Sequence, residues 1–282
     1  MAMPHRPRFL SYAQNREDVR LRRAFPHDDG FFIDVGAADP VEHSVTKALS
    51  LRGWTGINVE PQPYYIARLR ADRPRDINLN VGLSDAPGEL TFFESPSHRG
   101  FSTFDAAVAA TWAAKGIASR TFTVPTMTLT QLCQQHANRP IDFLKIDVEG
   151  HERSVLRGMD FARHRPVAVI VEATEQNSTA TNHATWELFL LNADYLFAAF
   201  DGLNRYYVRA ESKAVGEVLA IPPNVFDDYG PADVWEHVDE LNREVRELRD
   251  AVSSLRASLS HAQAAAGRSL RGRVKRWFRK AG

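Results

Sequence analysis

The chain has 282 residues, of which 44% are hydrophobic, so it can build a sizeable core in one catalytic domain with residues left over. Its one cysteine, Cys133, excludes a disulfide framework and a CxxC metal site, and its neighbours favour core packing over reactivity. The formal net charge is zero, but eight basic and no acidic residues follow Asp250. An acidic body with a basic tail argues against a catalytic domain that binds nucleic acid.

Residues 9–25 predict a capped, short amphipathic helix with Ser11 as its N-cap. The apolar side chains expected to be buried are Tyr12, Val19, Leu21 and Phe25. The polar side chains of this segment either reach over the opening of a ligand site or form a solvated helix face. They are Gln14, Glu17 and Asp18.

Residues 31–61 predict a nucleotide-binding βαβ unit. An apolar strand at 31–35 is followed by the turn Gly36-Ala37-Ala38, a helix at 42–52 and a second strand that ends before Glu60. An acid at that position can accept hydrogen bonds from both ribose hydroxyls. Only one glycine stands where a dinucleotide fingerprint has three, which favours S-adenosylmethionine and counts against a nicotinamide-dependent oxidoreductase.

The middle of the chain continues the alternation. We expect a helix at 64–71 and a strand at 77–81, followed by Ser84 and Asp85 in a loop that could touch an adenine edge or be a plain turn. Strands at 90–94 and 122–126 flank an insertion at 95–118, in which Gly100-Phe101-Ser102-Thr103 is either a substrate-facing loop or an irregular connection. A helix at 128–136 buries Leu129, Leu132 and Cys133.

The second half predicts a strand at 141–147, a helix to about residue 161, a doubly buried strand at 167–172 and a helix at 185–192. Segments 196–200 and 205–208 predict a hairpin, and 218–221 a last short strand. The alternation is typical of an α/β, doubly wound, mostly parallel sheet with an antiparallel end hairpin, spanning residues 1–230.

Acidic residues gather at the carboxyl ends of the expected strands, where open α/β sheets bind ligands. They are Asp34, Glu60, Asp85, Asp147 and Glu172, with Asp201 nearby. Asp147 and Glu172 end neighbouring strands and could hold a divalent cation or orient a base. His151 and His183 are the candidate bases, and the alternative for His151 is a half-exposed histidine at a helix start.

Four segments carry a family resemblance: SYAQNREDVRLRRAF, FIDVGAADPVEHSVT with RGWTGINVEP, DFLKIDVEGHE, and VEATEQ with FDGLNRYYV. Together they resemble the FkbM family of S-adenosylmethionine-dependent methyltransferases. The resemblance implies a Rossmann-like class I methyltransferase fold and methyl transfer, usually to oxygen on sugars or polyketide-type products. It spans roughly residues 11–229.

The resemblance also implies roles for individual residues. Asp34, Gly36 and Ala37 fall on the methionine and ribose side of the cofactor, Glu60 on the ribose hydroxyls, and Ser84 and Asp85 on the adenine side. Asp147, Glu149 and His151 fall on the catalytic edge. Where Asn often follows the Gly-Ala pair, this chain has Ala38-Asp39-Pro40, and we place Asp39 with the cofactor-binding residues.

Residues 231–262 predict a coiled-coil helix. Val occupies a (Val238, Val245 and Val252) and Leu occupies d (Leu241, Leu248 and Leu255), which favours a parallel homodimer through residues 234–259. The alternative is a helix packed on its own domain. Residues 263–282 form a basic tail, and the pattern over 268–280 suits an anionic membrane surface, with nucleic acid binding or a solvated tail as alternatives.

These observations predict an S-adenosylmethionine-dependent O-methyltransferase that acts on a hydroxyl of a sugar, glycan or glycolipid-type acceptor, as in polysaccharide biosynthesis. No apolar run reaches the length of a spanning helix, so we expect a cytoplasmic protein, peripheral at most on the inner face of the membrane. The rival from another class is a non-catalytic Rossmann-like scaffold, dimerised by its coil at a membrane-associated assembly.

Overall fold

The computed structural model describes residues 7–97 and 100–278, and the chain divides into two compact units, Met1–Gly230 and Pro231–Gly282. The first unit is built on a seven-stranded sheet with the order β11-β12-β10-β9-β2-β3-β4. Its strands are β2 (Phe31–Val35), β3 (Thr55–Val59), β4 (Ile77–Leu79), β9 (Phe143–Ile146), β10 (Ala168–Glu172), β11 (Tyr195–Phe200) and β12 (Asn204–Arg209). All pairs are parallel except those of β12, which runs antiparallel to β10 and β11. The predicted α/β sheet and its end hairpin are confirmed.

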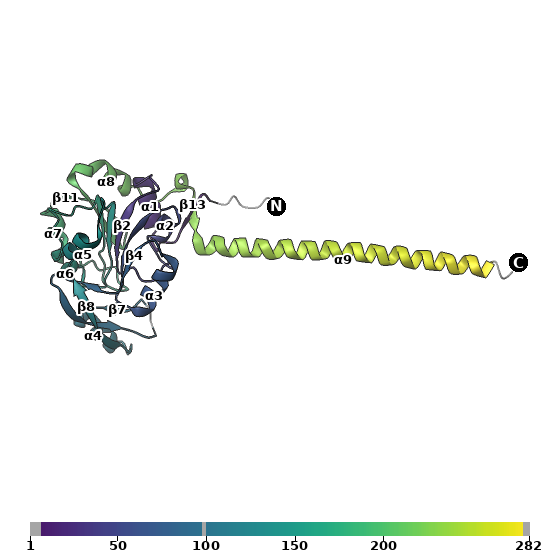
Figure 1. Cartoon of the computed structure of the whole chain (residues 1–282), viewed down its shortest axis with the longest axis horizontal. Coiled ribbons are helices and arrows are strands. Elements are labelled where there is room, and N and C mark those ends of the chain that lie inside the picture. The colour runs from purple at the N-terminus through teal and green to yellow at the C-terminus, as the bar shows by residue number, and fades with distance from the viewer. Residues whose placement is uncertain (1–6, 98–99, 279–282) are drawn as a thin grey trace. The chain divides into compact units, whose positions relative to one another are not determined.

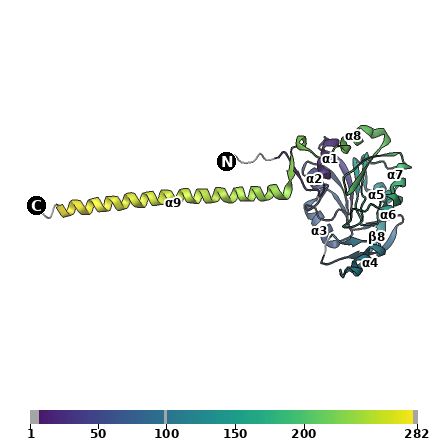
Figure 2. The same ribbon diagram turned by 180° about the vertical axis from the view of Figure 1, so that it is seen from behind.

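Helices cover both faces of this sheet (Figures 1 and 2). They are α1 (Glu17–Ala24), α2 (Lys47–Leu51), α3 (Pro63–Asp72), α5 (Leu129–His136), α6 (Glu152–Arg157), α7 (Glu187–Leu191) and α8 (Lys213–Ala220), with 3-10 turns η1 (His183–Thr185), η2 (Ala210–Ser212) and η3 (Val225–Asp227). Along β2, Ile33 and Val35 pack into one core cluster and Phe32 into another. Two cores, one on each face, make the sheet doubly wound.

A second, four-stranded sheet forms one end of the first unit (Figure 1). It contains β5 (Gly82–Leu83), β8 (Arg120–Met127), β6 (Gly88–Glu94) and β7 (Ser102–Thr103), in that order. The insertion expected at 95–118 therefore contributes β7 and α4 (Ala106–Ala114), and Asp105 caps that helix through the amide of Ala107 at 2.7 Å.

The N-terminal expectation is wrong in its details. Residues Phe9–Ser11 form strand β1, which pairs with β13 (Tyr229–Pro231), and the hydroxyl of Ser11 donates to Asp18 at 2.6 Å instead of capping a helix. Glu17 and Asp18 are buried rather than placed over a ligand mouth. Asp18 also accepts the amide of Tyr12 at 2.8 Å, so the carboxylate organises the segment before α1.

Two further elements differ from the expectation. The helix expected from residue 42 begins only at Lys47, because residues 40–46 form a loop held by hydrogen bonds to Arg73. The strand expected at 218–221 lies in α8, whose Val215 and Leu219 are four residues apart and pack on the same core cluster.

The second unit is helix α9 (Ala232–Phe278). Within residues 7–97 and 100–278, no helix is both long and apolar enough to cross a bilayer. The side chains of the expected membrane-facing segment, 268–280, lie outside those that the structure describes.

Candidate active site

A cavity of about 430 Å³, here called the first cavity, lies where the strand order of the large sheet reverses, between β2 and β9. Its floor comes from the carboxyl ends of three strands: Val35 and Gly36 after β2, Val59 and Glu60 after β3, and Asp147 after β9. Open α/β sheets bind ligands at this switch point.

Gly36 allows the turn after β2 to approach the end of β9 closely. Its φ is +77°, and a Cβ added there would lie 1.8 Å from the carbonyl oxygen of Asp147. Its amide donates to the carbonyl of Val59 at 3.0 Å. Any other residue would push apart the ends of β2 and β9, so the single glycine of the turn is required by geometry.

Glu60 lies in the cavity wall and is buried. One carboxylate oxygen accepts the amide of Ala38 at 2.9 Å and the other accepts the amide of Gln62 at 2.8 Å. Burial raises the pKa of Glu60 to about 7, although these two amide hydrogen bonds oppose the shift. Each oxygen keeps a free lone pair, as an acceptor for ribose hydroxyls requires.

Asp34 and Ala37 stand behind the cavity, not among its lining residues within the described part of the chain. Asp34 is buried, accepts the hydroxyl of Thr46 at 3.1 Å and lies 3.6 Å from the ammonium of Lys145. Ala37 packs against Ile66 and its neighbour Leu69 in α3. Both residues therefore position the turn rather than meet a ligand in the first cavity.

Asp39 lines the first cavity, as expected for a cofactor-binding residue. One of its oxygens accepts the amides of Val41 at 3.0 Å and Glu42 at 3.1 Å, and the other pairs with Arg68. These contacts fix the carboxylate at the rim formed by the loop after β2.

The structure does not bring Ser84 and Asp85 to the expected adenine side. Neither is among the described lining residues; Ser84 is buried and Asp85 pairs with Arg157 at 3.2 Å. An apolar wall occupies that side instead, formed by Leu83, Phe92 and Phe104 together with Val81 and Gly82. The rings of Phe92 and Phe104 lie 4.8 Å apart. The apolar residues of 90–94 were the available signal, but only the small sheet turns them toward the cavity.

Three carboxylates, here called the acidic cluster, meet beside the first cavity. Asp147, Glu149 and Glu172 each place an oxygen within 4.8 Å of the others. Burial and then the charge of Asp147 raise the pKa of both Glu149 and Glu172. This confirms that Asp147 and Glu172 end neighbouring strands, and oxygens so arranged could hold a divalent cation.

Lys145 partly offsets this negative charge, and the sequence reasoning missed it. Its ammonium lies 3.2 Å from Asp147 and 3.6 Å from Asp34. Although burial alone would lower it, the charges of Asp147 and then Asp34 raise the pKa of Lys145, so the side chain is a buried cation. A lysine within the apolar strand sequence IDFLKID was the available signal.

A second cavity, also about 430 Å³, adjoins the first. The two share four lining residues, His43, Gly100, Asp147 and Glu149. The remaining wall of the second cavity is largely polar and comes from Gln14, Phe101, Glu172, Thr174, Gln176, Asn177, Ser178 and Leu203. The acidic cluster therefore stands at the junction of the two cavities.

Contacts from the small sheet and α4 hold the wall between the cavities. The hydroxyl of Thr103 donates to the carbonyl of Glu149 at 2.7 Å. The indole of Trp112 donates to Gln176 at 2.7 Å, and the amide of Gln176 donates to the carbonyl of Gly100 at 3.3 Å. Gln176 thus links the insertion to the loop after β10, a role that the sequence did not suggest.

The two histidines expected to act as bases stand elsewhere, since neither is among the described residues that line the cavities. His151 faces the hydroxyl of Ser84 at 3.3 Å and the ring of Phe104, and burial lowers its pKa. His183 lies 4.0 Å from Glu187. His43 lines both cavities instead, and nothing in its loop sequence marked it.

Four of the seven non-glycine residues that have positive φ in the described part of the chain line the cavities. Ala38, His43, Glu149 and Asn177 all have positive φ, between 46° and 57°, and each lines one or both cavities. Left-handed conformations of residues other than glycine are costly and cluster at functional sites. The strain supports the assignment of this region as the active site.

Residues 34–197 match the family model described as the Methyltransferase FkbM domain, which is 164 of the 282 residues. The chain belongs to the FkbM methyltransferase domain family. The family resemblance is confirmed over residues 34–197, and the stretches SYAQNREDVRLRRAF and FDGLNRYYV lie outside this match. The matched region contains Glu60, Asp147 and Glu172, the strand-end acids that line the cavities. Membership of the family implies S-adenosylmethionine as the methyl donor, and it removes support for a nicotinamide-dependent oxidoreductase.

Solved structures similar to this chain include methyltransferase FkbM from Methylobacillus flagellatus KT, with 15% identity, a TM-score of 0.40, and coverage of 67% of this chain and 47% of that one. The chain thus spans about half the length of that protein. A TehB-like SAM-dependent methyltransferase from Corynebacterium glutamicum ATCC 13032 Kitasato has 10% identity, a TM-score of 0.38 and coverage of 68% and 87%. Precorrin-6y C5,15-methyltransferase from Geobacter metallireducens GS-15 has 11% identity, a TM-score of 0.35, and coverage of 71% of this chain and 95% of that one. No curated protein matches the chain.

Proposed function

We propose that this chain transfers a methyl group from S-adenosylmethionine to a hydroxyl group of a sugar, glycan or glycolipid-type acceptor. One observation carries the proposal: a cavity at the switch point of the sheet and a polar cavity beside it share the carboxylates of Asp147 and Glu149. A donor and an acceptor bound in the two cavities would meet at these side chains.

The first cavity suits the donor. Gly36 leaves room beside the end of β9, Glu60 offers two carboxylate oxygens to ribose hydroxyls, and Phe92 with Leu83 offers an apolar wall to an adenine ring. When bound, S-adenosylmethionine supplies a methyl group that its sulfonium already activates. The protein therefore has to position the acceptor, exclude water and accept one proton.

Glu149 is the residue that we assign as proton acceptor. It lines both cavities, and its pKa is raised by burial and by Asp147, which brings the carboxylate closer to the basicity that general-base catalysis near neutral pH requires. His43, which also lines both cavities, is the second candidate. His151 and His183 are set aside, because neither side chain is placed in a described cavity wall.

The composition of the second cavity supports a hydroxyl-rich acceptor. Carboxylates accept hydrogen bonds from hydroxyl donors, and the amides and hydroxyls of Gln14, Gln176, Asn177 and Ser178 can both donate and accept. Phe101 adds one aromatic surface. A sugar ring, with several hydroxyls around an apolar face, is complementary to such a wall.

We also propose that the acidic cluster binds a divalent cation. Asp147, Glu149 and Glu172 offer three converging oxygens of the kind that Mg²⁺ and Ca²⁺ prefer. A cation there would keep all three carboxylates ionised and lower the basicity of Glu149, so in the cation-bound protein His43 would be the proton acceptor. Calorimetric titration of the protein with MgCl₂ should show binding that the Glu172→Gln variant weakens, and absence of binding in both proteins would contradict this part of the proposal.

The basic tail supports a location of the protein at an anionic membrane surface. Residues 268–280 carry seven basic residues around Trp277 and Phe278, which suits an anionic membrane surface near lipid-linked glycans. Flotation with anionic liposomes should capture the intact chain and not a chain that ends at Gly267. Equal flotation of both proteins, or of neither, would remove the membrane from the proposal.

The deciding experiment separates the enzyme from the non-catalytic scaffold. Calorimetry should show that the protein binds S-adenosylmethionine, that Glu60→Gln weakens binding by about tenfold or more, and that the exposed Glu89→Gln does not. Incubation with methyl-labelled S-adenosylmethionine and a panel of cell-envelope glycans should then label an acceptor. A protein that binds no S-adenosylmethionine is the scaffold.

A further inference from the structure

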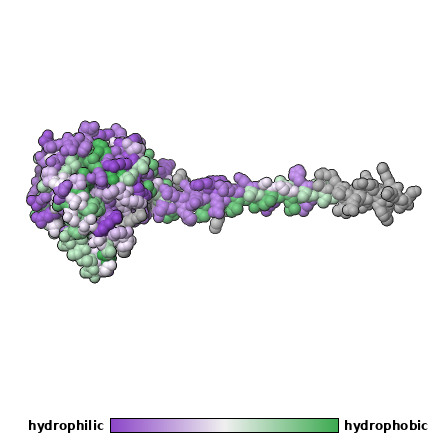
Figure 3. All heavy atoms as spheres, turned by 60° about the horizontal axis from the view of Figure 1, so that its bottom comes forward, coloured by the Kyte–Doolittle hydropathy of each residue, from purple (hydrophilic) through white to green (hydrophobic). Residues whose placement is uncertain are grey.

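Helix α9 exposes a row of apolar side chains at alternating spacings of four and three residues. The members with exposed fractions between 43% and 69% are Val234, Leu241, Val245, Leu248, Val252, Leu255 and Leu259. Val238, half-buried, completes the pattern. Figure 3 shows hydrophobic residues gathered in a strip along the helix. We call this row the α9 seam.

Such a helix needs a partner. In proteins most helical stability comes from packing of an apolar face rather than from helix propensity, and the α9 seam is such a face left open to solvent. The spacing of the α9 seam repeats every seven residues, which is the repeat that a supercoiled partner helix satisfies along its whole length. The seam is about 39 Å long at 1.5 Å per residue.

We propose that the α9 seam pairs with the same seam of a second copy of this chain, as a parallel two-stranded coiled coil over residues 234–259. Val at a (Val238, Val245 and Val252) with Leu at d (Leu241, Leu248 and Leu255) is the combination that favours two parallel strands. Both copies then contribute identical layers to the interface.

Charge also selects the parallel arrangement. Glu244 occupies g and Arg249 the following e, so each pairs with its opposite charge on the partner helix when two copies run in the same direction. An antiparallel pair sets g against g and e against e, which separates Glu244 from Arg249 of the partner helix. The exchange of these charges is therefore a test of direction as well as of contact.

The mass of the full-length protein in solution tests the pairing. Light scattering should give twice 31.7 kDa at micromolar concentration. Leu248→Glu, at a d position, should raise the dissociation constant at least tenfold and give a monomer, and Ser254→Glu, which adds the same charge at position c, should stay dimeric. Circular dichroism checks that α9 stays helical. A monomeric or higher-order wild type, or a dimeric Leu248→Glu, would overturn the proposal.

Two further sets of variants test the direction. Glu244→Arg should weaken the dimer, and Glu244→Arg with Arg249→Glu should restore it. Leu255→Cys should form a covalent dimer on mild oxidation, because the two d positions face each other in a parallel pair. The native Cys133 is buried and should not cross-link. A mixture of Leu255→Cys and Val238→Cys proteins that cross-links to each other, while Leu255→Cys alone does not, would show an antiparallel pair and overturn the proposal. None of these measurements depends on methyl transfer.

Discussion

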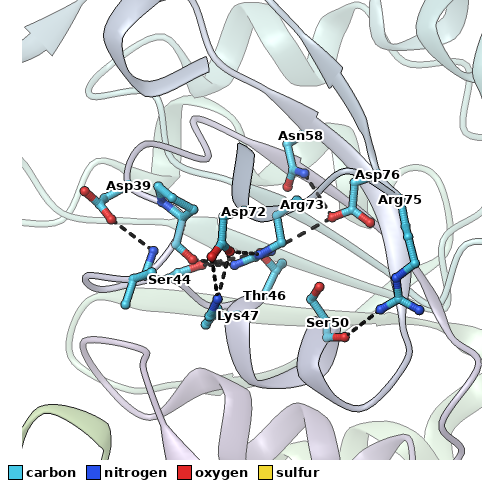
Figure 4. Close-up of polar contacts among 12 residues, drawn as sticks. Asp39, Ser44, Thr46, Lys47, Ser50, Asn58, Asp72, Arg73, Arg75 and Asp76 are labelled. Carbon is cyan, nitrogen blue, oxygen red and sulfur yellow. Dashed lines mark hydrogen bonds and ion pairs between the residues drawn. The ribbon is translucent and has the colours of Figure 1, made fainter. Parts of the chain in front are cut away.

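The guanidinium of Arg73 donates to the hydroxyl of Thr46 at 3.1 Å (Figure 4), and the same hydroxyl donates to Asp34 at 3.1 Å. Arg73 also donates to the hydroxyl of Ser44 at 3.2 Å and to the carbonyl of Pro40 at 2.5 Å. One buried arginine therefore ties the loop after the Gly36 turn to the strand-end acid behind the first cavity.

Loss of this arginine should destabilise the protein strongly. Arg73→Ala leaves the buried carbonyl of Pro40 without its donor and removes the guanidinium that lies 4.0 Å from the buried carboxylate of Asp76. We therefore expect the free energy of unfolding in urea to fall by about 3–5 kcal/mol. Arg75→Ala is the matched control, because Arg75 is exposed and contacts only the carbonyl of Ser50 among the bonds drawn in Figure 4. Its cost should stay below about 1 kcal/mol. Equal costs would show that the Arg73 network contributes little.

Ala38 holds a conformation that alanine disfavours, with φ at 46°. Ala38→Gly should therefore stabilise the fold by about 0.5–1 kcal/mol in urea unfolding, because glycine adopts this conformation without strain. Asn, which tolerates it better than alanine, should act in the same direction. The same change in a helix, Ala110→Gly in α4, should destabilise by about 1 kcal/mol. A loss of stability in Ala38→Gly would contradict the strain at this turn.

Stability should fall as the pH rises from about 4.5 to about 7. Burial raises the pKa of Glu17 to about 7, with the same direction for Glu60 and Glu152. Over this range the folded state holds protons that the unfolded state has released. Each of these groups therefore lowers the free energy of unfolding by up to about 3 kcal/mol between pH 4.5 and pH 7. Above pH 7 the group is ionised in both states, and its contribution no longer changes.

Glu17→Gln tests this dependence. Glutamine cannot ionise, so the variant should lose less stability than the wild type between pH 5 and pH 7 in urea unfolding. The backbone amide of Asn15 and the side-chain amide of Asn204 donate to the two oxygens of Glu17. Disturbance of these hydrogen bonds lowers the stability of the variant by the same amount at every pH, so it does not affect the difference in slope between the variant and the wild type. The exposed Glu89→Gln should keep the wild-type slope. A variant with the wild-type slope would exclude Glu17 as a source.

Glu149→Gln should remove the proposed proton acceptor. We expect kcat for the acceptor found by labelling to fall about 100-fold or more, and the dependence of kcat on pH to flatten on its acidic side. The control is Glu175→Gln, which removes an exposed carboxyl in the loop after β10 and should leave kcat within about twofold. If Glu149→Gln keeps full activity, the assignment passes to His43, and His43→Gln should then reproduce the loss.

Much of the first unit could be predicted from the sequence, because local patterns decide it. The runs 31–35 and 167–172 are apolar except for Asp34 and Glu172, and they form the strands β2 and β10, which are buried on both faces. Asp201-Gly202 marked the end hairpin. The family resemblance singled out Glu60, Asp147 and Glu149, and all three line the first cavity, while the roles it implies for them stay predictions.

The orientation of side chains could not be predicted in the same way. His151 follows the densest chemical motif, yet its ring turns toward Ser84, because position on a helix start does not decide which wall a side chain faces. Gln176 and His43 reach the cavities through loops, whose path depends on tertiary contacts such as that of Trp112. Residues 218–221 are β-branched and aliphatic in part, and tertiary packing of α8 overrode that local preference.

If the donor and the acceptor occupy the two cavities as proposed, both ligands contact the same four residues, His43, Gly100, Asp147 and Glu149. We therefore expect occupation of one cavity to change the affinity of the other for its ligand. Linkage requires the effect to be reciprocal: the factor by which the donor alters acceptor binding equals the factor by which the acceptor alters donor binding. A measurement of either factor thus supplies the other, even for an acceptor too weak to titrate alone.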